Sequence, residues 1–173
     1  MRRRFGKTLI IGGTGMLARA TRWIAARSDR VTLMARRPEA LARDLGAEAC
    51  SLDWADPGAA SAMAQLPGDF DLAVIWLHDA AAHLARPAED RLCPGGRVCR
   101  VHGARSADPK VRTAREPDPR PGLDRQVVIL GWHPDPVGED GKRWLSDAEI
   151  SGGVIAALRD PALEALTIGG ASG

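Results

Sequence analysis

The stretch Lys7-Thr-Leu-Ile-Ile-Gly-Gly-Thr-Gly-Met-Leu-Ala18 decides the fold. Thr8 to Ile11 form a short apolar and β-branched run, which is typical of a strand buried on both faces of a sheet. Three glycines follow, and after them apolar residues recur at helical spacing. The stretch therefore predicts a buried strand, a glycine-rich turn and a helix, in that order.

A strand, a glycine turn and a helix together form the setting in which the pattern G-x-x-G-x-x-A indicates a dinucleotide site. Gly12 is expected to allow the tight turn, Gly15 to let the backbone approach a pyrophosphate, and Ala18 to let the helix pack on the sheet. The N–H groups of Met16 and Leu17, at the helix start, would then point at phosphate. The alternative is a glycine-rich turn that binds nothing.

The composition is that of an ordinary globular protein. A chain of 173 residues suffices for one domain, and we expect a single domain over 1–173. The net charge of +2, with both signs spread along the chain, is not the footprint of a nucleic-acid-binding protein. Arginine or aspartate interrupts every apolar stretch, so no membrane span is predicted. Met1-Arg-Arg-Arg4 is not a secretory signal, and three cysteines without paired spacing favour a cytoplasmic protein.

Predicted strands and helices alternate along the chain. The expected strands are 8–11, 31–35, 47–52, 71–77, 97–102 and 126–130, with a short edge strand at 166–168. The first expected helix ends near Ser28; the others are 38–45, 57–66, 80–86 with a break or kink at Pro87, and one that begins after Ser146. Residues 103–124 and 132–144 are expected to be loops. This alternation predicts a doubly wound α/β fold, a parallel sheet in the order 3-2-1-4-5-6 with helices on both faces.

Three short motifs carry a resemblance to a known family. Ile11-Gly-Gly-Thr-Gly-Met-Leu-Ala18, Ala35-Arg-Arg-Pro38 and Leu52-Asp-Trp-Ala-Asp56 stand in an order and spacing similar to those of the short-chain dehydrogenase/reductase superfamily. The Gly-Gly-Thr-Gly form most resembles its atypical branch, which includes small NADPH-dependent reductases and proteins without known catalysis. The resemblance implies a Rossmann domain that binds NAD or NADP. The cofactor-binding residues expected from it and from the strand ends are Gly12, Gly13, Thr14, Gly15, Met16, Leu17, Arg36, Arg37, Asp53, Trp54, Trp76 and Leu77.

The departures from that superfamily concern the chemistry. Its catalytic Tyr-x-x-x-Lys is impossible here because the chain has no tyrosine. The asparagine-rich motif that usually follows the fourth strand is replaced by His78-Asp-Ala-Ala81. The catalytic serine has no clear match, and Ser106 is the nearest hydroxyl. The resemblance therefore extends to the cofactor and not to the reaction.

Arg36 and Arg37 follow the second strand, where an acidic residue would bind the ribose 2′-hydroxyl of NAD. An arginine there suits a 2′-phosphate by charge and bidentate geometry, so NADP is favoured over NAD. The alternative is two solvated arginines. Asp53, at the end of the third strand, matches the aspartate that faces the adenine amino group in the superfamily, or is a loop cap. Trp54 beside it either covers the adenine or packs.

His78, His102 and His133 lie at the ends of the fourth, fifth and sixth strands. Ligands bind at the carboxyl ends of parallel strands, so all three are expected near one crevice. A histidine can donate a proton near neutral pH, which makes His78 and His102 the catalytic candidates. The alternatives are strand caps and, with less support, a zinc site. Trp132 and Trp144 bracket the second loop and either form the substrate wall or pin the loop.

Two functional hypotheses remain. The first is an NADPH-dependent reductase of a small carbonyl or conjugated substrate. The second is a nucleotide-dependent sensor or regulatory protein without catalysis, which the missing tyrosine favours. A methyltransferase would want an acidic residue where Arg36 stands, so it is disfavoured. A small-molecule substrate or effector is the expected partner. Trp23, off the apolar face of its helix, either marks a subunit contact in a homo-oligomer or is simply exposed.

Overall fold

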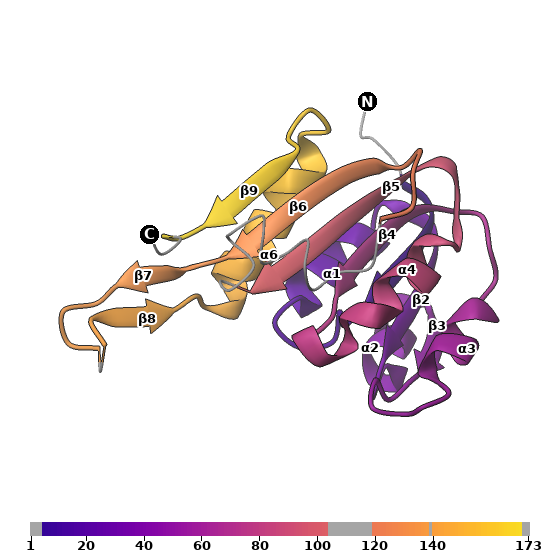
Figure 1. Cartoon of the computed structure of the whole chain (residues 1–173), viewed down its shortest axis with the longest axis horizontal. Coiled ribbons are helices and arrows are strands. Elements are labelled where there is room, and N and C mark those ends of the chain that lie inside the picture. Colours follow the sequence, from indigo (N-terminus) through magenta and orange to yellow (C-terminus); the bar gives the residue numbers. More distant parts are fainter. Residues whose placement is uncertain (1–4, 104–118, 139, 171–173) are drawn as a thin grey trace.

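The computed structural model describes residues 5–103, 119–138 and 140–170. Its main sheet has seven strands, all paired in parallel, in the order β3-β2-β1-β4-β5-β6-β9 (Figure 1). The strands are β1 (Phe5–Ile11), β2 (Ser28–Ala35), β3 (Glu48–Ser51), β4 (Phe70–Trp76), β5 (Leu92–Gly103), β6 (Asp124–Leu130) and β9 (Ala165–Ile168). The predicted order is confirmed, and β9 extends the sheet beyond β6 as an edge strand.

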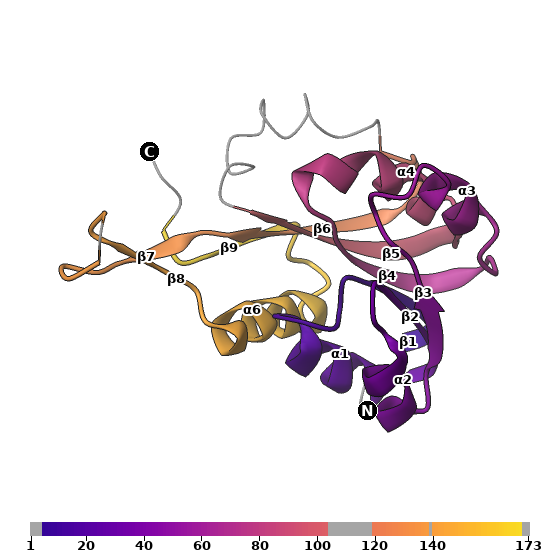
Figure 2. The ribbon, with the colours of Figure 1, turned by 90° about the horizontal axis from the view of Figure 1, so that it is seen from below.

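Helices cover both faces of the sheet, as the doubly wound prediction requires. Figure 2 shows α1 (Ala18–Ala25), α2 (Glu39–Leu45) and α6 (Asp147–Arg159) on one side, and α3 (Ala59–Ala64) and α4 (Ala85–Glu89) on the other. A 3-10 helix, η1 (Asp79–Leu84), leads directly into α4. None of the helices in the described residues is long and apolar enough to cross a membrane.

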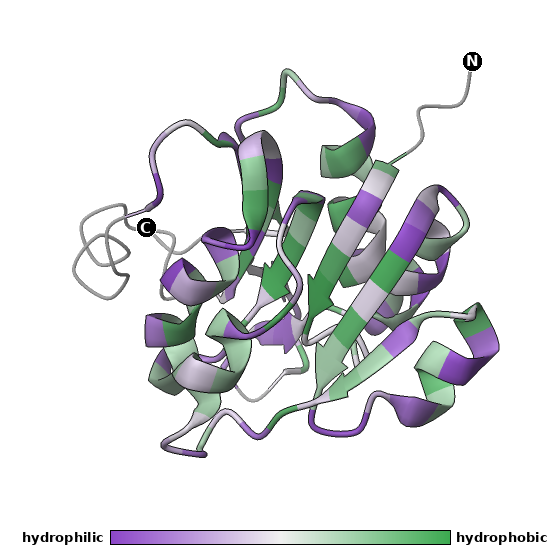
Figure 3. Ribbon diagram, turned by 90° about the vertical axis from the view of Figure 1, so that its right-hand side faces the viewer, coloured by the Kyte–Doolittle hydropathy of each residue, from purple (hydrophilic) through white to green (hydrophobic). Residues whose placement is uncertain are grey.

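Two apolar clusters hold these layers together. On the α1 and α6 side, Ile10, Leu33 and Val74 pack with Ile24 of α1 and Val154 of α6. The cluster on the opposite face joins the alternate residues of the same strands to α3, η1 and α4. Figure 3 shows the apolar residues running through the strands between the helical layers. Burial on both faces explains why the strands read as continuous apolar runs.

The expected loop 132–144 is the main error of the prediction. It holds an antiparallel hairpin of β7 (Trp132–Pro134) and β8 (Lys142–Trp144), which extends from the end of the sheet (Figure 1). Trp132 N–H donates to the carbonyl of Gly170 at 3.1 Å, and Gly170 N–H donates back at 2.7 Å. These two hydrogen bonds fasten the base of the hairpin to the chain that follows β9.

Other boundaries moved by a few residues. α1 ends at Ala25, not near Ser28, because Ser28 already pairs with Phe5 in the sheet. The helix expected to break or kink at Pro87 instead changes type two residues earlier, from 3-10 to α at Ala85. Pro87 therefore falls in the first turn of α4, where its missing N–H costs nothing. Of the expected loop 103–124, residues 104–118 lie outside the described residues.

A buried carboxylate joins α4 to β5 and β6. Glu89 is 1% exposed, and its two oxygens accept hydrogen bonds from the Arg125 guanidinium at 2.9 and 2.7 Å. Arg100 Nη1 donates to it at 3.3 Å and the Arg120 backbone N–H at 2.9 Å. Burial alone would raise the pKa of Glu89, but the hydrogen bonds from Arg125 and Arg120 and the nearby arginine charges hold that pKa below its ordinary value.

Candidate functional site

The glycine turn after β1 places three glycines in three different surroundings. Gly12 has a φ of 74°, and a Cβ there would lie 2.4 Å from the carbonyl oxygen of Trp76. A Cβ on Gly13 would lie 2.5 Å from Thr21 Oγ1, which donates a hydrogen bond to the Gly13 carbonyl at 2.8 Å. Gly15 has no atom within 4 Å of its Cβ position and faces open space.

Gly13 makes a close contact between the turn and α1 through Thr21, and Ala18 packs against the core cluster on the α1 side of the sheet. Ala18 is half-buried and begins α1, where its N–H donates to the Gly15 carbonyl at 2.8 Å. Leu17 precedes the helix with its side chain buried in the core. The first turn of α1 holds no acidic residue, so the positive end of the helix dipole faces this region without a compensating carboxylate.

A cavity of about 430 Å³ opens over this turn. It reaches from the end of β2 across the glycine turn to the end of β4. The residues that line it are Gly12, Thr14, Gly15, Met16, Ala35, Arg36, Arg37, Trp54, Trp76 and His78. Most of the predicted cofactor residues therefore meet around one hollow. The predicted residues that do not line it are Gly13, Leu17, Asp53 and Leu77.

Arg36 and Arg37 stand exposed on the wall of this cavity, directly after β2. The Arg36 carbonyl accepts a hydrogen bond from Ser51 Oγ at 3.0 Å, which ties this backbone to the end of β3. Within the described part of the chain, neither guanidinium has an ion pair. Both are therefore available to an anionic ligand.

Asp53 makes a local hydrogen bond at the end of the third strand. It is exposed, and its Oδ1 accepts a hydrogen bond from the Ala55 N–H at 3.0 Å, a turn that the carboxylate closes on its own chain. This is the cap alternative that the sequence left open. Its neighbour Trp54 lines the cavity.

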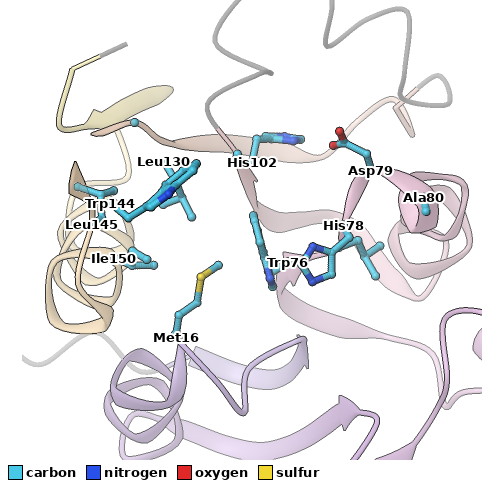
Figure 4. A pocket seen from close by; sticks show the side chains of 13 residues that line it. Met16, Trp76, His78, Asp79, Ala80, His102, Leu130, Trp144, Leu145 and Ile150 are labelled. Carbon is cyan, nitrogen blue, oxygen red and sulfur yellow. The ribbon is translucent and has the colours of Figure 1, made fainter. Parts of the chain in front are cut away.

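A second cavity, shown in Figure 4, has a volume of about 520 Å³ and adjoins the first. Met16, Trp76 and His78 line both cavities, so the two form one trough along the carboxyl ends of the strands. The other residues that line the second cavity are Leu77, Asp79, Ala80, His102, Gly103, Leu130, Gly131, Trp144, Leu145 and Ile150. Sequence reasoning had named Trp144 as a possible part of the substrate wall, but it missed Leu130, Leu145 and Ile150, which lie in β6, directly after the hairpin and in α6.

The structure brings together two of the three expected histidines. His78 follows β4, and its ring meets Trp76 edge-on at a centroid distance of 5.4 Å. His102 in β5 is 8% exposed and lines the second cavity. His133 lines neither cavity; its Nε2 lies 2.9 Å from Glu149 Oε1. The expectation that all three face one crevice was wrong, since β7 carries His133 away toward α6.

The described residues hold no group of three or more His, Cys, Asp or Glu side chains suited to a metal ion. Ser106, the hydroxyl nearest to a catalytic serine in sequence, lies outside the described residues. Trp132 packs under Lys142, whose Nζ lies 4.2 Å from its ring centroid, and it does not line the cavity. Of the two tryptophans that bracket the hairpin, only Trp144 belongs to the site.

Glu149 holds the hairpin against α6. Arg143 donates to both of its oxygens at 3.1 Å, and the Ser146 N–H donates at 2.8 Å as part of a capping box. The Arg143 hydrogen bonds, followed by those of Ser146, lower the pKa of Glu149 well below its ordinary value. These contacts on either side of Trp144 and Leu145 keep the two side chains at the cavity wall.

Ser151 connects α6 to the glycine turn, and sequence reasoning missed it. Its side chain is fully buried, donates to the Met16 carbonyl at 2.9 Å and accepts from the Ala20 N–H at 3.3 Å. Ser151 lies in α6 shortly after the capping box, and nothing in the sequence around it indicates a hydrogen-bond partner 135 residues away. Ser151 therefore attaches Met16, which lines both cavities, to α6, which forms part of the wall of the second cavity.

No protein-family model matches the sequence, and no curated protein sequence matches it. Similar solved structures exist. A crystal structure of BdcA in complex with NADPH has a TM-score of 0.65 at 17% identity and covers 98% of this chain and 95% of that one. The structure of BdcA from E. coli has a TM-score of 0.63 at 19% identity, covering 97% and 100%. A short-chain dehydrogenase/reductase from Serratia marcescens has a TM-score of 0.67 at 18% identity, covering 99% of both chains. At these identities the likeness is one of fold.

Proposed function

We propose that this protein binds NADP(H) in the trough and reduces a small carbonyl or conjugated substrate in the second cavity. The observation that carries the proposal is the continuous hollow from Arg36 and Arg37, past Gly15, to His78 and His102. Similarity to a structure solved with NADPH supports the same cofactor.

The chain's own residues fit such a group. The open space at Gly15 and the N-terminal end of α1 suit a pyrophosphate, and the free guanidinium groups of Arg36 and Arg37 suit a 2′-phosphate. Trp54 offers an aromatic face beside them. When bound, NADPH would supply the hydride. The protein's tasks are then to hold the dinucleotide and to deliver a proton to the substrate oxygen.

The proton donor in this proposal is a histidine, because the chain has no tyrosine. His78 is the first choice because it lines both cavities. His102 is the second choice because it lines only the second cavity. Imidazole is suited to general acid catalysis near neutral pH.

A titration calorimetry experiment with NADPH and NADH tests the cofactor assignment. A charge-assisted contact to the 2′-phosphate contributes about 1.5–3 kcal/mol, so NADPH should bind about tenfold more tightly than NADH or better. In the double variant Arg36→Ala with Arg37→Ala this preference should disappear. Arg43→Ala, an exposed arginine of α2 outside both cavities, is the matched control and should keep it. Equal affinities in the wild type would refute the NADP assignment.

A second candidate function follows from the missing tyrosine: a nucleotide-dependent sensor that binds NADPH without turnover. A screen of carbonyl, quinone and flavin substrates, with NADPH oxidation as the readout, distinguishes the reductase from the sensor. Tight NADPH binding without oxidation for any substrate would favour the sensor.

A further inference from the structure

The two cavities of the trough differ in charge. Arg36 and Arg37 wall the first, whereas the residues that line the second include no lysine or arginine among those the structure describes. Asp79 is the acidic residue on the second wall. An anionic substrate group that entered this cavity would lose part of its water and would meet neither a lysine nor an arginine among the described residues that line it. Burial of an unpaired charge is costly, so the cavity disfavours carboxylates and phosphates.

One side of the second cavity is lined by apolar side chains alone. Leu130, Leu145, Ile150 and Trp144 come from β6, the hairpin and α6, and in Figure 4 they lie on the side opposite to His78. The polar groups are His78 and Asp79, which follow β4, and His102, which lies in β5. A ligand with an apolar body and a polar end therefore has one favoured direction, with its polar end toward the histidines.

Trp144 supplies an uncovered aromatic surface at this site. It is 77% exposed although it lines the cavity, and its neighbours Arg143 and Leu145 are held to α6. Trp76 lies on the far side of the same cavity (Figure 4). Large exposed aromatic surface that is fixed in place suits a flat ligand, because stacking on the indole adds to the gain from apolar burial.

We propose that the second cavity binds an uncharged, planar, apolar carbonyl compound such as an aryl ketone or a quinone, with its ring against Trp144 and its oxygen toward His78 and His102. That this compound is the substrate rests on the proposed function. In that reaction a hydride from NADPH adds to the carbonyl carbon, a proton adds to the oxygen, and NADPH leaves as NADP⁺. The preference for a neutral ring system follows from the cavity alone.

Equilibrium dialysis with two matched probes tests the preference. The probes are methyl naphthyl ketone and the same ketone with a carboxylate on its second ring. The neutral ketone should bind at least about tenfold more tightly, a ratio that corresponds to the loss of about 1.4 kcal/mol for the charged probe. Equal binding, or tighter binding of the carboxylate, would overturn the proposal.

Three variants locate the effect. Trp144→Ala should weaken the neutral ketone about threefold to tenfold through lost stacking, while Val137→Ala, in the same hairpin but 94% exposed and outside the cavity, should leave it unchanged. Ala80→Arg places a cation on an exposed stretch of the cavity wall and should raise the affinity for the carboxylate at least about threefold. No effect of Trp144→Ala, or no gain in Ala80→Arg, would contradict the assigned cause.

The test of the second cavity's preference for a neutral ligand can fail independently of the test of the proposed function. Calorimetric titration of NADPH on the same samples reports the cofactor site independently. A chain that prefers the neutral ketone but binds no NADPH would refute the reductase and keep the cavity's specificity. A chain that binds NADPH but does not distinguish the two ketones would refute the specificity alone.

Discussion

Gly12, Gly13 and Gly15 are needed for different reasons, and the difference sets what a substitution would do. Gly12 adopts a backbone conformation that other residues rarely reach, and Gly13 has no room for a Cβ beside Thr21. A side chain at either position would disturb the fold. Gly15 has space for one, so a side chain there would compete with a ligand and not with the protein.

His78 is the residue on which the proposed chemistry depends most. If it donates the proton, His78→Ala should lower NADPH-dependent turnover about 100-fold or more, the lower end of what general acid catalysis contributes. The affinity for NADPH should hold, because the charged contacts lie at the other end of the trough. The measurement is NADPH oxidation with a substrate from the screen, together with calorimetric titration. His83→Ala, an exposed histidine of η1 outside both cavities, is the control. Undiminished turnover in His78→Ala would move the role to His102 or to water.

At the scale of elements, the buried strands could be predicted and the hairpin could not. β1, β2 and β4 carry uninterrupted apolar runs, and Gly46 in the left-handed conformation ends α2 where the sequence predicted. The strands of the hairpin have three residues each and include Pro134. What holds them is not a pattern within the strands but the contacts with Glu149, in the first turn of α6, and with Gly170, which follows β9.

The junction of α4 with β5 and β6 depends on one carboxylate. Glu89→Gln keeps the shape but removes the charge that faces Arg100 and Arg125, so the free energy of unfolding should fall by about 3 kcal/mol or more, as when a buried pair is broken. The control is Asp90→Asn at the next residue, which breaks an exposed ion pair with Arg86. It should lower the free energy of unfolding by less than about 1 kcal/mol. Urea denaturation of both variants measures the difference.

The same pair of variants has a pH signature. The folded state lowers the pKa of Glu89, so its stabilisation is present above the unfolded pKa of about 4.3 and is lost as pH falls through the folded value. The gap between wild type and Glu89→Gln should therefore close as the solution is acidified below that unfolded pKa. A gap of equal size at every pH, or similar costs for Glu89→Gln and Asp90→Asn at neutral pH, would show that the charge is not what stabilises the junction.

At the scale of the whole molecule, the sheet order followed from the sequence and the trough did not. Alternating strands and helices allow few topologies once crossovers are right-handed, so the order could be predicted. The second cavity is built from Met16, Trp76, Leu130, Trp144 and Ile150, which are far apart in the chain. Motifs could indicate the cavity over the glycine turn because that turn is local in sequence, whereas the second cavity depends on how α6 and the hairpin close on the sheet.

The central claim is that the trough is a dinucleotide site, and titration calorimetry of NADPH on the wild type, Gly15→Val and Gly152→Val tests it most directly. Both glycines have open space at the Cβ position, but Gly152 lies on α6 outside both cavities, so the two variants carry the same substitution in different places. Circular dichroism should match the wild type in both. The account predicts about one NADPH per chain for the wild type and Gly152→Val, and no measurable binding for Gly15→Val because its side chain occupies the pyrophosphate volume. Absence of binding in the wild type, or unchanged binding in Gly15→Val, would contradict it.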